Sequence, residues 1–192
     1  MEKASIYLDY NATTPLRPEV KAELLSVLGE PNNPSSIHSL GRSARRRLEK
    51  SRNQIAKLIN ASPENIIFTS GGTEANNLAL KGGQYTNIIV SSVEHEAVLA
   101  ATPNAKKINV DKDGIVILSE LENVLADING DCLVSIMWAN NETGIIQPIP
   151  EIIQIAKSYN LHIHCDAVQA VGKIPIDFKS SGLDSMAISA HK

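Results

Sequence analysis

The chain has 192 residues, of which 43% are hydrophobic and 20% are charged, and this composition suits one sizeable globular core. A formal net charge of −3 and an aromatic content of 4% argue against a nucleic-acid partner, which would need a basic field and stacking surfaces. The apolar runs are too short for a membrane span and the start MEKASIYLDY lacks the pattern of a signal peptide, so we expect a cytoplasmic protein without a membrane partner.

Residues 1–60 predict an N-terminal helical arm that lies outside the main sheet. Helical patterns cover residues 18–28 and 41–59, and a loop over residues 30–36 separates them. The second pattern is rich in basic side chains, namely those of Arg42, Arg45, Arg46, Arg47, Lys50 and Arg52. Because apolar residues recur along the same helix, a solvated basic face is favoured over a surface for nucleic acid or an acidic partner.

Residues 61–192 predict an α/β domain, which follows turn residues near position 63. Strand-like apolar runs alternate with helical patterns, which is typical of a mainly parallel sheet covered by helices. The predicted strands are residues 66–69, 87–91, 132–139, 162–166 and 184–189. The predicted helices are residues 73–80, a segment that begins near residue 94, and residues 150–159.

A glycine turn comes between the first predicted strand and helix of this domain, in TSGGTEANN. Glycines and the free N–H groups of a helix start suit a phosphate group. The same residues also suit a plain turn in which Thr73 caps the helix. The motif by itself favours neither interpretation.

The strand HIHCD places His162, His164 and Asp166 on one face. Such a face could bind zinc. A carboxylate at the carboxyl end of a strand also lies where α/β sheets bind ligands. Short motif matches are weak, so the ligand-binding interpretation is favoured over a zinc hydrolase.

Two further segments follow predicted strands. Ser91, Ser92 and His95 could suggest a hydrolase, but no nucleophile elbow is present, and a helix cap at Ser92 explains the pattern better. In the segment WANNETG, Asn140 and Asn141 place amides at the end of a strand, although asparagine and glycine also favour a tight turn.

The chain ends in SMAISAHK, so Lys192 follows an apolar strand pattern. Partial desolvation there would make its amine a better nucleophile. By itself, however, Lys192 is better explained as an ordinary terminal surface lysine. Together, however, the helix start, the carboxylate, the amides, a histidine and this lysine are the groups that pyridoxal 5'-phosphate requires.

The sequence resembles the NifS/IscS-like cysteine desulfurases of the class V aminotransferase family, which have the pyridoxal-phosphate-dependent transferase fold type I. The resemblance rests on YLDYNATTPLRPEV, NPSSIHSLGRSARRRLE, IIFTSGGTEANNLAL, VEHEAVL, WANNETGIIQPI, HCDAVQAVGKIPID and ISAHK, in family order over nearly the whole chain. It implies that residues 1–60 belong to the small domain and the substrate entrance. It also implies that residues 61–192 form an incomplete large cofactor-binding domain.

The resemblance implies a role for each matching residue. Lys192 would form the Schiff base with pyridoxal phosphate, and Asp166 would pair with the pyridine nitrogen. His95 would stack on the ring and act as an acid–base group. Gln169 would bond the phenolic oxygen, and Asn141 would lie close to that oxygen and to the substrate.

The phosphate site follows from the same resemblance. Gly72 and Thr73 would hold the phosphate from the helix start, with help from Ser189. His191 would lie beside the lysine. The segment at residues 11–13 would approach the substrate. No metal site is expected.

The implied reaction converts L-cysteine to L-alanine and passes sulfur to an enzyme cysteine as a persulfide, for iron–sulfur cluster or thio-cofactor synthesis. The implied partners are a second copy in a homodimer and a sulfur-acceptor or scaffold protein. Cys132 and Cys165 lie inside apolar runs and do not match the persulfide cysteine. The family's substrate-binding arginine and C-terminal small domain have no counterpart either, so we expect these residues to be the N-terminal part of a longer desulfurase. The alternatives are another class V enzyme, such as a selenocysteine lyase or an aminotransferase-like enzyme, and an inactive fragment or paralogue with a scaffold role.

Overall fold

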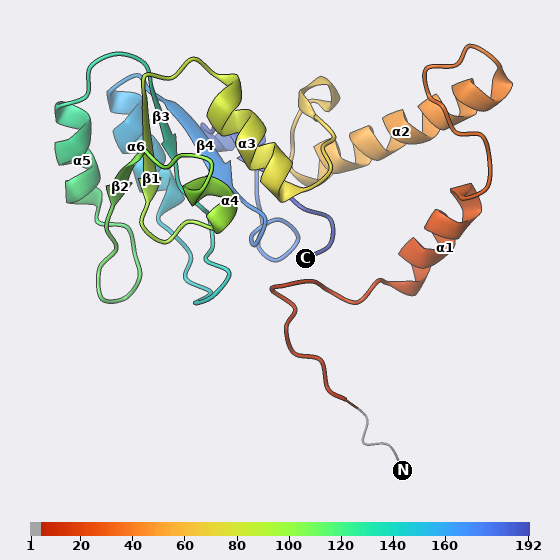
Figure 1. The fold of residues 1–192 in the computed structure, drawn as a ribbon, viewed down its shortest axis with the longest axis horizontal. Helices are drawn as coiled ribbons and strands as arrows, with labels where there is room; N and C mark the ends of the chain where they lie inside the picture. The colour runs from red at the N-terminus through yellow and green to blue at the C-terminus, as the bar shows by residue number, and fades with distance from the viewer. Residues whose placement is uncertain (1–4) are drawn as a thin grey trace. The chain divides into compact units, whose positions relative to one another are not determined.

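The structure is a computed structural model that describes residues 5–192 (Figure 1). The chain divides into two compact units. The first unit reaches to Ile67 and includes His191, and the second comprises Phe68–Ala190 and Lys192. None of the helices in the described part of the chain is long and apolar enough to cross a membrane.

The first unit contains helices α1 (Pro18–Val27) and α2 (Ser39–Leu58) and a short 3-10 turn, η1 (Pro63–Asn65). Helix α1 begins at a proline, which cannot donate a backbone hydrogen bond and is therefore well suited to a first turn. Helix α2 is capped by His38, whose Nδ1 accepts from the Gly41 amide at 3.3 Å. Both helices predicted for this region are confirmed to within two residues at each end.

Three basic side chains of α2 form ion pairs within the same unit. Arg45 lies 3.4 Å from the Glu49 carboxylate, Arg52 lies 3.0 Å from it, and Arg47 lies 3.5 Å from that of Glu30. These ion pairs support the interpretation of a solvated, locally paired face.

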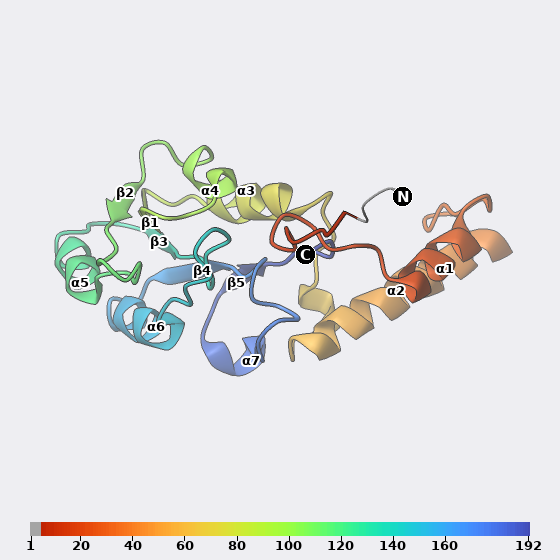
Figure 2. The same cartoon turned by 90° about the horizontal axis from the view of Figure 1, so that it is seen from below.

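The second unit is built on a parallel sheet of five strands in the order β2-β1-β3-β4-β5. The strands are β1 (Asn87–Ser91), β2 (Lys106–Ile108), β3 (Cys132–Ser135), β4 (His162–Asp166) and β5 (Ser185–Ala187). Its helices are α3 (Gly72–Gly82), α4 (Glu96–Leu99), α5 (Leu118–Ala126), α6 (Ile149–Ser158) and α7 (Phe178–Ser181). Helices α3 and α4 cover one face of the sheet, and α5, α6 and α7 cover the other (Figure 2). The predicted α/β fold with a covered parallel sheet is confirmed.

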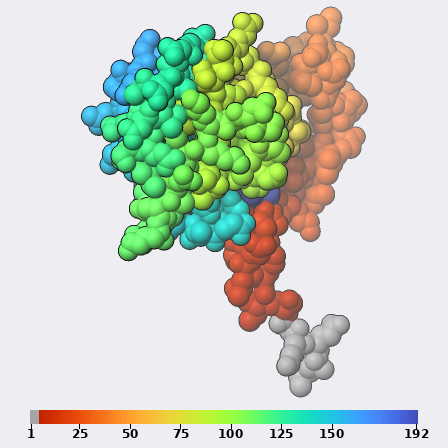
Figure 3. Space-filling model, turned by 60° about the vertical axis from the view of Figure 1, so that its left-hand side comes forward, coloured from red at the N-terminus to blue at the C-terminus, as the bar shows by residue number. Residues whose placement is uncertain are grey.

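The two faces of the sheet bury separate apolar clusters because side chains alternate along each strand. Ile89, Val134 and Ile163 are buried with residues of α5 and α6. On the opposite face, Val90 and Leu133 are buried with residues of α3 and α4. Because both faces are covered, the central strands β1 and β3 are apolar over most of their length. The segments of this unit, coloured from yellow-green to blue, form a continuous surface in the space-filling view (Figure 3).

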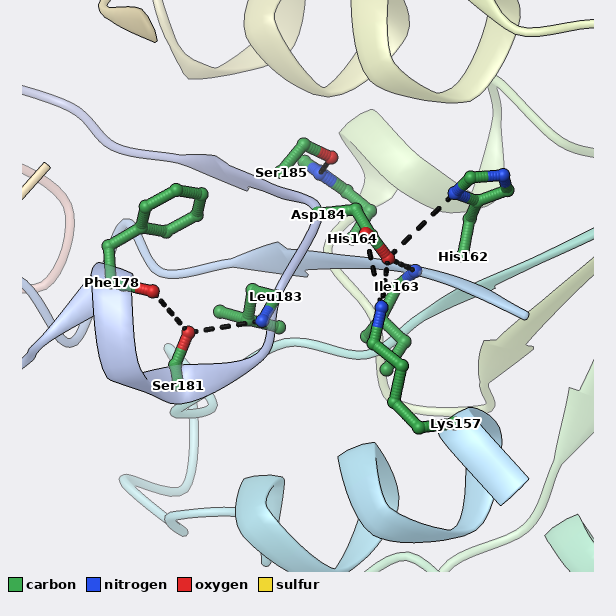
Figure 4. A network of polar contacts seen from close by, with 9 residues as sticks. All are labelled: Lys157, His162, Ile163, His164, Phe178, Ser181, Leu183, Asp184 and Ser185. Carbon is green, nitrogen blue, oxygen red and sulfur yellow. Dashed lines mark hydrogen bonds and ion pairs between the residues drawn. The ribbon is translucent and has the colours of Figure 1, made fainter. Parts of the chain in front are cut away.

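Asp184 holds the start of β5 to the start of β4 (Figure 4). Its Oδ2 accepts from the Ile163 amide at 2.7 Å and from Lys157 Nζ at 2.9 Å. His162 lies 3.9 Å from the same oxygen. One carboxylate therefore joins α6 to two neighbouring strands at the edge opposite their carboxyl ends.

Three predicted strands differ from the structure. Residues 66–69 form no strand, and Ile67 and Phe68 are exposed. The strands predicted at 132–139 and 184–189 are shorter, since the chain turns away from the sheet after Ser135 and Ala187.

Two glycines offer a test of how tightly the second unit packs. Gly182 ends α7 at φ 88°, and an added Cβ would lie 3.0 Å from Ile153 Cγ2. Gly172 has a similar φ of 82°, but an added Cβ would meet no atom within 4 Å. We expect Gly172→Ala to lower the free energy of unfolding by about 1 kcal/mol through backbone strain alone. Gly182→Ala should cost about 1 kcal/mol more, because Ile153 must move. Urea unfolding of the whole protein measures both; equal losses would contradict a steric contribution from Ile153.

Candidate active site

The carboxyl ends of all five strands meet at one edge of the sheet because every strand pair is parallel. After β1 the chain moves to β2 on one side, and it then returns to β3 on the other side of β1. Such a reversal leaves a crevice outside the strand ends, where α/β sheets bind ligands. His95 follows β1 and Asn141 follows β3, so the two residues come after the strands that flank this position.

Asp166 ends β4 at this edge and is only 6% exposed. Its Oδ2 accepts from Asn76 Nδ2 at 2.7 Å, and its Oδ1 accepts from the Val168 amide at 3.0 Å. No basic side chain of the described residues forms an ion pair with it. A carboxylate has further lone pairs, so Asp166 can still accept from a cationic N–H group of a ligand.

His164 lies behind Asp166, on the same face of β4. Its Nε2 is 3.0 Å from Asn76 Oδ1, and its Nδ1 is 2.8 Å from Ser185 Oγ. Burial lowers the pKa of His164 to about 4, so the imidazole is neutral at neutral pH. Protein partners therefore engage both ring nitrogens.

The three residues considered for a zinc site have different environments. His162 is exposed, whereas His164 and Asp166 are buried and bonded to Asn76. Within residues 5–192, no group of three or more histidine, cysteine, aspartate or glutamate side chains is arranged to hold a metal ion.

The glycine turn opens α3, as the sequence predicts. Gly71 is the N-cap, and no side chain caps this helix, so the alternative of a Thr73 cap is wrong. An added Cβ at Gly71 would meet no atom within 4 Å, whereas one at Gly72 would lie 3.2 Å from Val168 Cγ2 and 3.9 Å from Ser189 Cβ. Gly72 therefore lets the helix start approach the segments that follow β4 and β5.

His95 caps helix α4, and its exposed imidazole accepts from the Ala97 amide through Nδ1 at 3.0 Å. The alternative of a cap at Ser92 is therefore wrong. Asn140, which is buried, donates to the Val93 carbonyl at 3.0 Å and so joins the segment after β3 to the segment that carries His95. Asn141 is half-buried and donates to Glu142 Oε1 at 2.8 Å.

Of the remaining candidate residues, Gln169 and Lys192 belong to the second unit and His191 belongs to the first. Lys173 Nζ donates to Gln169 Oε1, and partial burial together with the charge of Lys192 lowers the pKa of Lys173. Lys192 and Gln169 thus share Lys173 as a neighbour. His191 belongs to the first unit, where its carbonyl accepts from the Thr14 amide at 2.8 Å and its ring lies 3.2 Å from Thr13 Oγ1.

The structure also identifies polar residues that the sequence does not mark as candidates. Asn76 and Ser185 join candidate residues through hydrogen bonds, and Glu94 is buried just after β1. The sequence contains only a weak indication of the role of Asn76. It is an asparagine inside an amphipathic helix, and a polar side chain on the buried face of a helix needs a hydrogen-bond partner.

Glu94 joins the carboxyl ends of β1 and β3. Its Oε1 accepts from Ser91 Oγ at 2.6 Å and from the Met137 amide at 2.8 Å, while its Oε2 is buried without a hydrogen-bond partner. Burial, and to a smaller extent the charge of Asp166, raises the pKa of Glu94 to about 8. Glu94 is therefore mostly a neutral acid at neutral pH, next to a carboxylate.

This pKa gives a prediction about stability. Glu94 binds its proton more tightly when folded, so its contribution is complete below pH 4.5, its ordinary pKa, and is lost as the pH rises toward 8. The free energy of unfolding of the wild type should therefore fall, relative to that of the Glu94→Gln variant, as the pH rises across this range. We expect the difference between the two whole proteins to grow by on the order of 1 kcal/mol per pH unit. His164 titrates in both proteins, so its effect cancels in the comparison. The exposed Glu96→Gln is the control, and equal pH profiles for all three proteins would show that Glu94 is not a buried acid.

Comparisons with known proteins agree with this architecture. Residues 6–192 match the family described as aminotransferase class-V. The chain is 46% identical to a cysteine desulfurase IscS of Dictyoglomus turgidum, over 99% of this chain and 51% of that protein. It is 40% identical to an IscS-like cysteine desulfurase of Mycobacterium tuberculosis, over 97% of this chain and 52% of that protein.

Solved structures give the same result. A NifS-like protein from Rickettsia africae superposes with a TM-score of 0.93 at 44% identity, covering 97% of this chain and 54% of the other. A cysteine desulfurase from Thermococcus onnurineus superposes with a TM-score of 0.82 at 28% identity, covering 97% of this chain and 50% of the other. The chain spans about half the length of these relatives. With the family matched over residues 6–192, the chain belongs to the class V aminotransferase family.

Proposed function

We propose that this chain forms the cofactor-binding part of a pyridoxal-phosphate-dependent cysteine desulfurase. The observation that carries the proposal is Asp166, a buried carboxylate at the carboxyl edge of the sheet with two neutral hydrogen-bond donors. It occurs in a chain whose relatives are named cysteine desulfurases. An electron-withdrawing ring needs such a carboxylate to keep its nitrogen protonated.

The residues present fit pyridoxal phosphate. Asp166 offers the ring nitrogen an acceptor that no basic side chain of the described residues occupies. The start of α3 is open at Gly71 and approaches Ser189 at Gly72, which suits a phosphate near a helix start. When bound, the cofactor supplies an electron sink for the carbon next to the substrate amine.

Each candidate side chain would then have a definite role. Lys192 would hold the cofactor covalently, and Asp166 would hold the proton on the ring nitrogen. His95 would cover the ring and move protons, since a histidine can do both near neutral pH. Gln169 would donate an amide N–H group to the phenolic oxygen, and Asn141 would lie close to that oxygen and to the substrate.

The phosphate would be held from several segments. Gly72 and Thr73 would contribute from the helix start, and Ser189 would contribute a hydroxyl. His191 would stand next to the lysine in sequence. In the first unit His191 contacts Thr13, within the segment proposed to approach the substrate.

The proposed reaction takes sulfur from L-cysteine. A thiolate of the enzyme attacks the substrate sulfur, the carbon–sulfur bond breaks, and the carbon gains a proton to give L-alanine and an enzyme persulfide. Neither cysteine of this chain suits that thiolate, because burial raises the pKa of Cys132 to about 11 and that of Cys165 well above its ordinary value. We therefore assign the acceptor thiol to a part of the whole protein beyond these residues.

The proposal extends to partners and location. The enzyme would act as a homodimer and would pass sulfur to an acceptor or scaffold protein of iron–sulfur cluster or thio-cofactor synthesis. The two free, buried thiols suit the reducing conditions of the cytoplasm.

Borohydride reduction of the whole protein tests the function. Reduction should fix pyridoxal phosphate to Lys192, and peptide mass mapping should find the increment there. Lys192→Ala should lose the increment and the release of alanine from L-cysteine, with activity falling at least about a thousandfold, as expected when a covalent catalytic group is removed. Lys179→Ala is the matched control, because Lys179 is an exposed lysine of α7.

The possible results separate the proposed activity from its rivals. An increment at Lys192 with no alanine from L-cysteine would leave a cofactor-binding protein that is not a desulfurase. Alanine formation from L-selenocysteine alone would indicate a selenocysteine lyase. The absence of any increment would contradict cofactor binding itself.

A further inference from the structure

A row of buried polar side chains ends on Asp166. Ser185 on β5 lies 2.8 Å from His164 Nδ1, His164 Nε2 lies 3.0 Å from Asn76 Oδ1, and Asn76 Nδ2 lies 2.7 Å from Asp166 Oδ2. Asn76 and His164 are each 1% exposed. Figure 4 shows the Ser185–His164 end of this row, where β5 and β4 lie side by side.

The direction of every hydrogen bond in the row follows from its last member. A carboxylate oxygen accepts, so Asn76 must turn its Nδ2 toward Asp166 and its Oδ1 toward His164. The oxygen of Asn76 accepts, so His164 must carry its proton on Nε2. His164 Nδ1 is then an acceptor, and the Ser185 hydroxyl must donate to it.

A single protonation state of His164 keeps this direction. Burial lowers the pKa of His164 to about 4, so the ring is neutral and has one N–H group at neutral pH. All three donors therefore face the carboxylate end of the row. Hydrogen bonds aligned in one direction polarise one another, which strengthens the bond at the end.

We propose that Asn76, His164 and Ser185 are positioning residues, which hold the Asp166 carboxylate in the orientation that binds the ring nitrogen of pyridoxal phosphate. This inference rests on the proposed function, because Asp166 has a ring nitrogen to bind only if the cofactor is pyridoxal phosphate. It adds that the affinity for the ring nitrogen depends on side chains that do not touch the cofactor.

The test compares two ligands of the whole protein freed of cofactor. One is pyridoxal phosphate, and the other is its carbocyclic analogue, in which a C–H group replaces the ring nitrogen. The ratio of the two dissociation constants isolates the contribution of the ring nitrogen, because the phosphate and the lysine contacts are common to both. We expect the wild type to prefer pyridoxal phosphate, and Asp166→Ala to lose this preference.

Asn76→Leu should weaken binding of pyridoxal phosphate by about 3- to 10-fold and leave the analogue nearly unchanged, as expected for the net contribution of one hydrogen bond. His164→Met should have a smaller effect in the same direction. His164→Gln should restore the preference, because the amide of glutamine can donate to Asn76. Ser185→Ala, the mildest change, should have the smallest effect.

Gln147→Met is the matched control. Gln147 is another buried amide, but its hydrogen bonds run to the Val116 amide and the Gly114 carbonyl, away from Asp166. It should lower stability without changing the ratio of the two dissociation constants. If Asn76→Leu weakens the binding of both ligands equally, the ratio of the two dissociation constants stays unchanged, as it should in the control. Asn76 then has only a structural role, and the inference is wrong.

The outcomes separate this inference from the proposed function. If Asp166→Ala loses the preference and Asn76→Leu keeps it, the cofactor assignment stands and the positioning role fails. If the wild type binds both ligands equally, Asp166 does not bind the ring nitrogen and the inference fails with that assignment. If the wild type binds neither ligand, the proposed function itself is wrong.

Discussion

A buried carboxylate without a cation must be stabilised by oriented neutral donors, and this requirement organises the second unit. Asp166 meets it with a side-chain amide from α3 and a backbone amide from the turn after β4. Each donor needs its own support, since an unsatisfied buried amide costs about 1–3 kcal/mol. The support for Asn76 reaches back through His164 to β5. One negative charge thus links a helix and two strands.

Glu94 is the second buried carboxyl group at the carboxyl edge of the sheet, and it has fewer hydrogen-bond donors than its burial requires. Glu94 has donors on Oε1 only, and its Oε2 has no hydrogen-bond partner. Burial therefore dominates and raises its pKa to about 8. A neutral Glu94 does not repel the Asp166 charge, so two acidic residues can lie at the same edge of the sheet, one after β1 and one at the end of β4. Environments that separate two carboxyl groups in this way are common in active sites.

Local pattern in the sequence predicts the frame of the fold but not these connections. The strand HIHCD and its terminal Asp166 could be predicted because Ile163 and Cys165 alternate with polar residues, which is the period of a strand. Strand β2 has little apolar signal, since Lys106 and Lys107 occupy most of its length, so local pattern does not predict this strand. The run at residues 66–69 has strand-forming residues but is not a strand in the structure. The bonds from Asn76 to Asp166 and His164 span 90 and 88 residues, and no local pattern specifies a partner at that separation.

Helix α3 sets the distance between the proposed phosphate contact and the proposed ring-nitrogen contact. Gly72 and Asn76 are one turn apart and lie on the same face of the helix, as residues four apart do. The first would contact the phosphate, and the second holds the carboxylate proposed for the ring nitrogen. A rigid helical turn rises about 6 Å over four residues, so the spacing of the two ends of the site is set by backbone geometry and not by flexible side chains. The glycine at position 72 is then needed for a packing reason, since a larger residue would press on Val168, whose amide is the other donor to Asp166. The phosphate contact and the ring-nitrogen contact that we propose would therefore both depend on the packing of helix α3, and the segment TSGGTEANN would contribute to both.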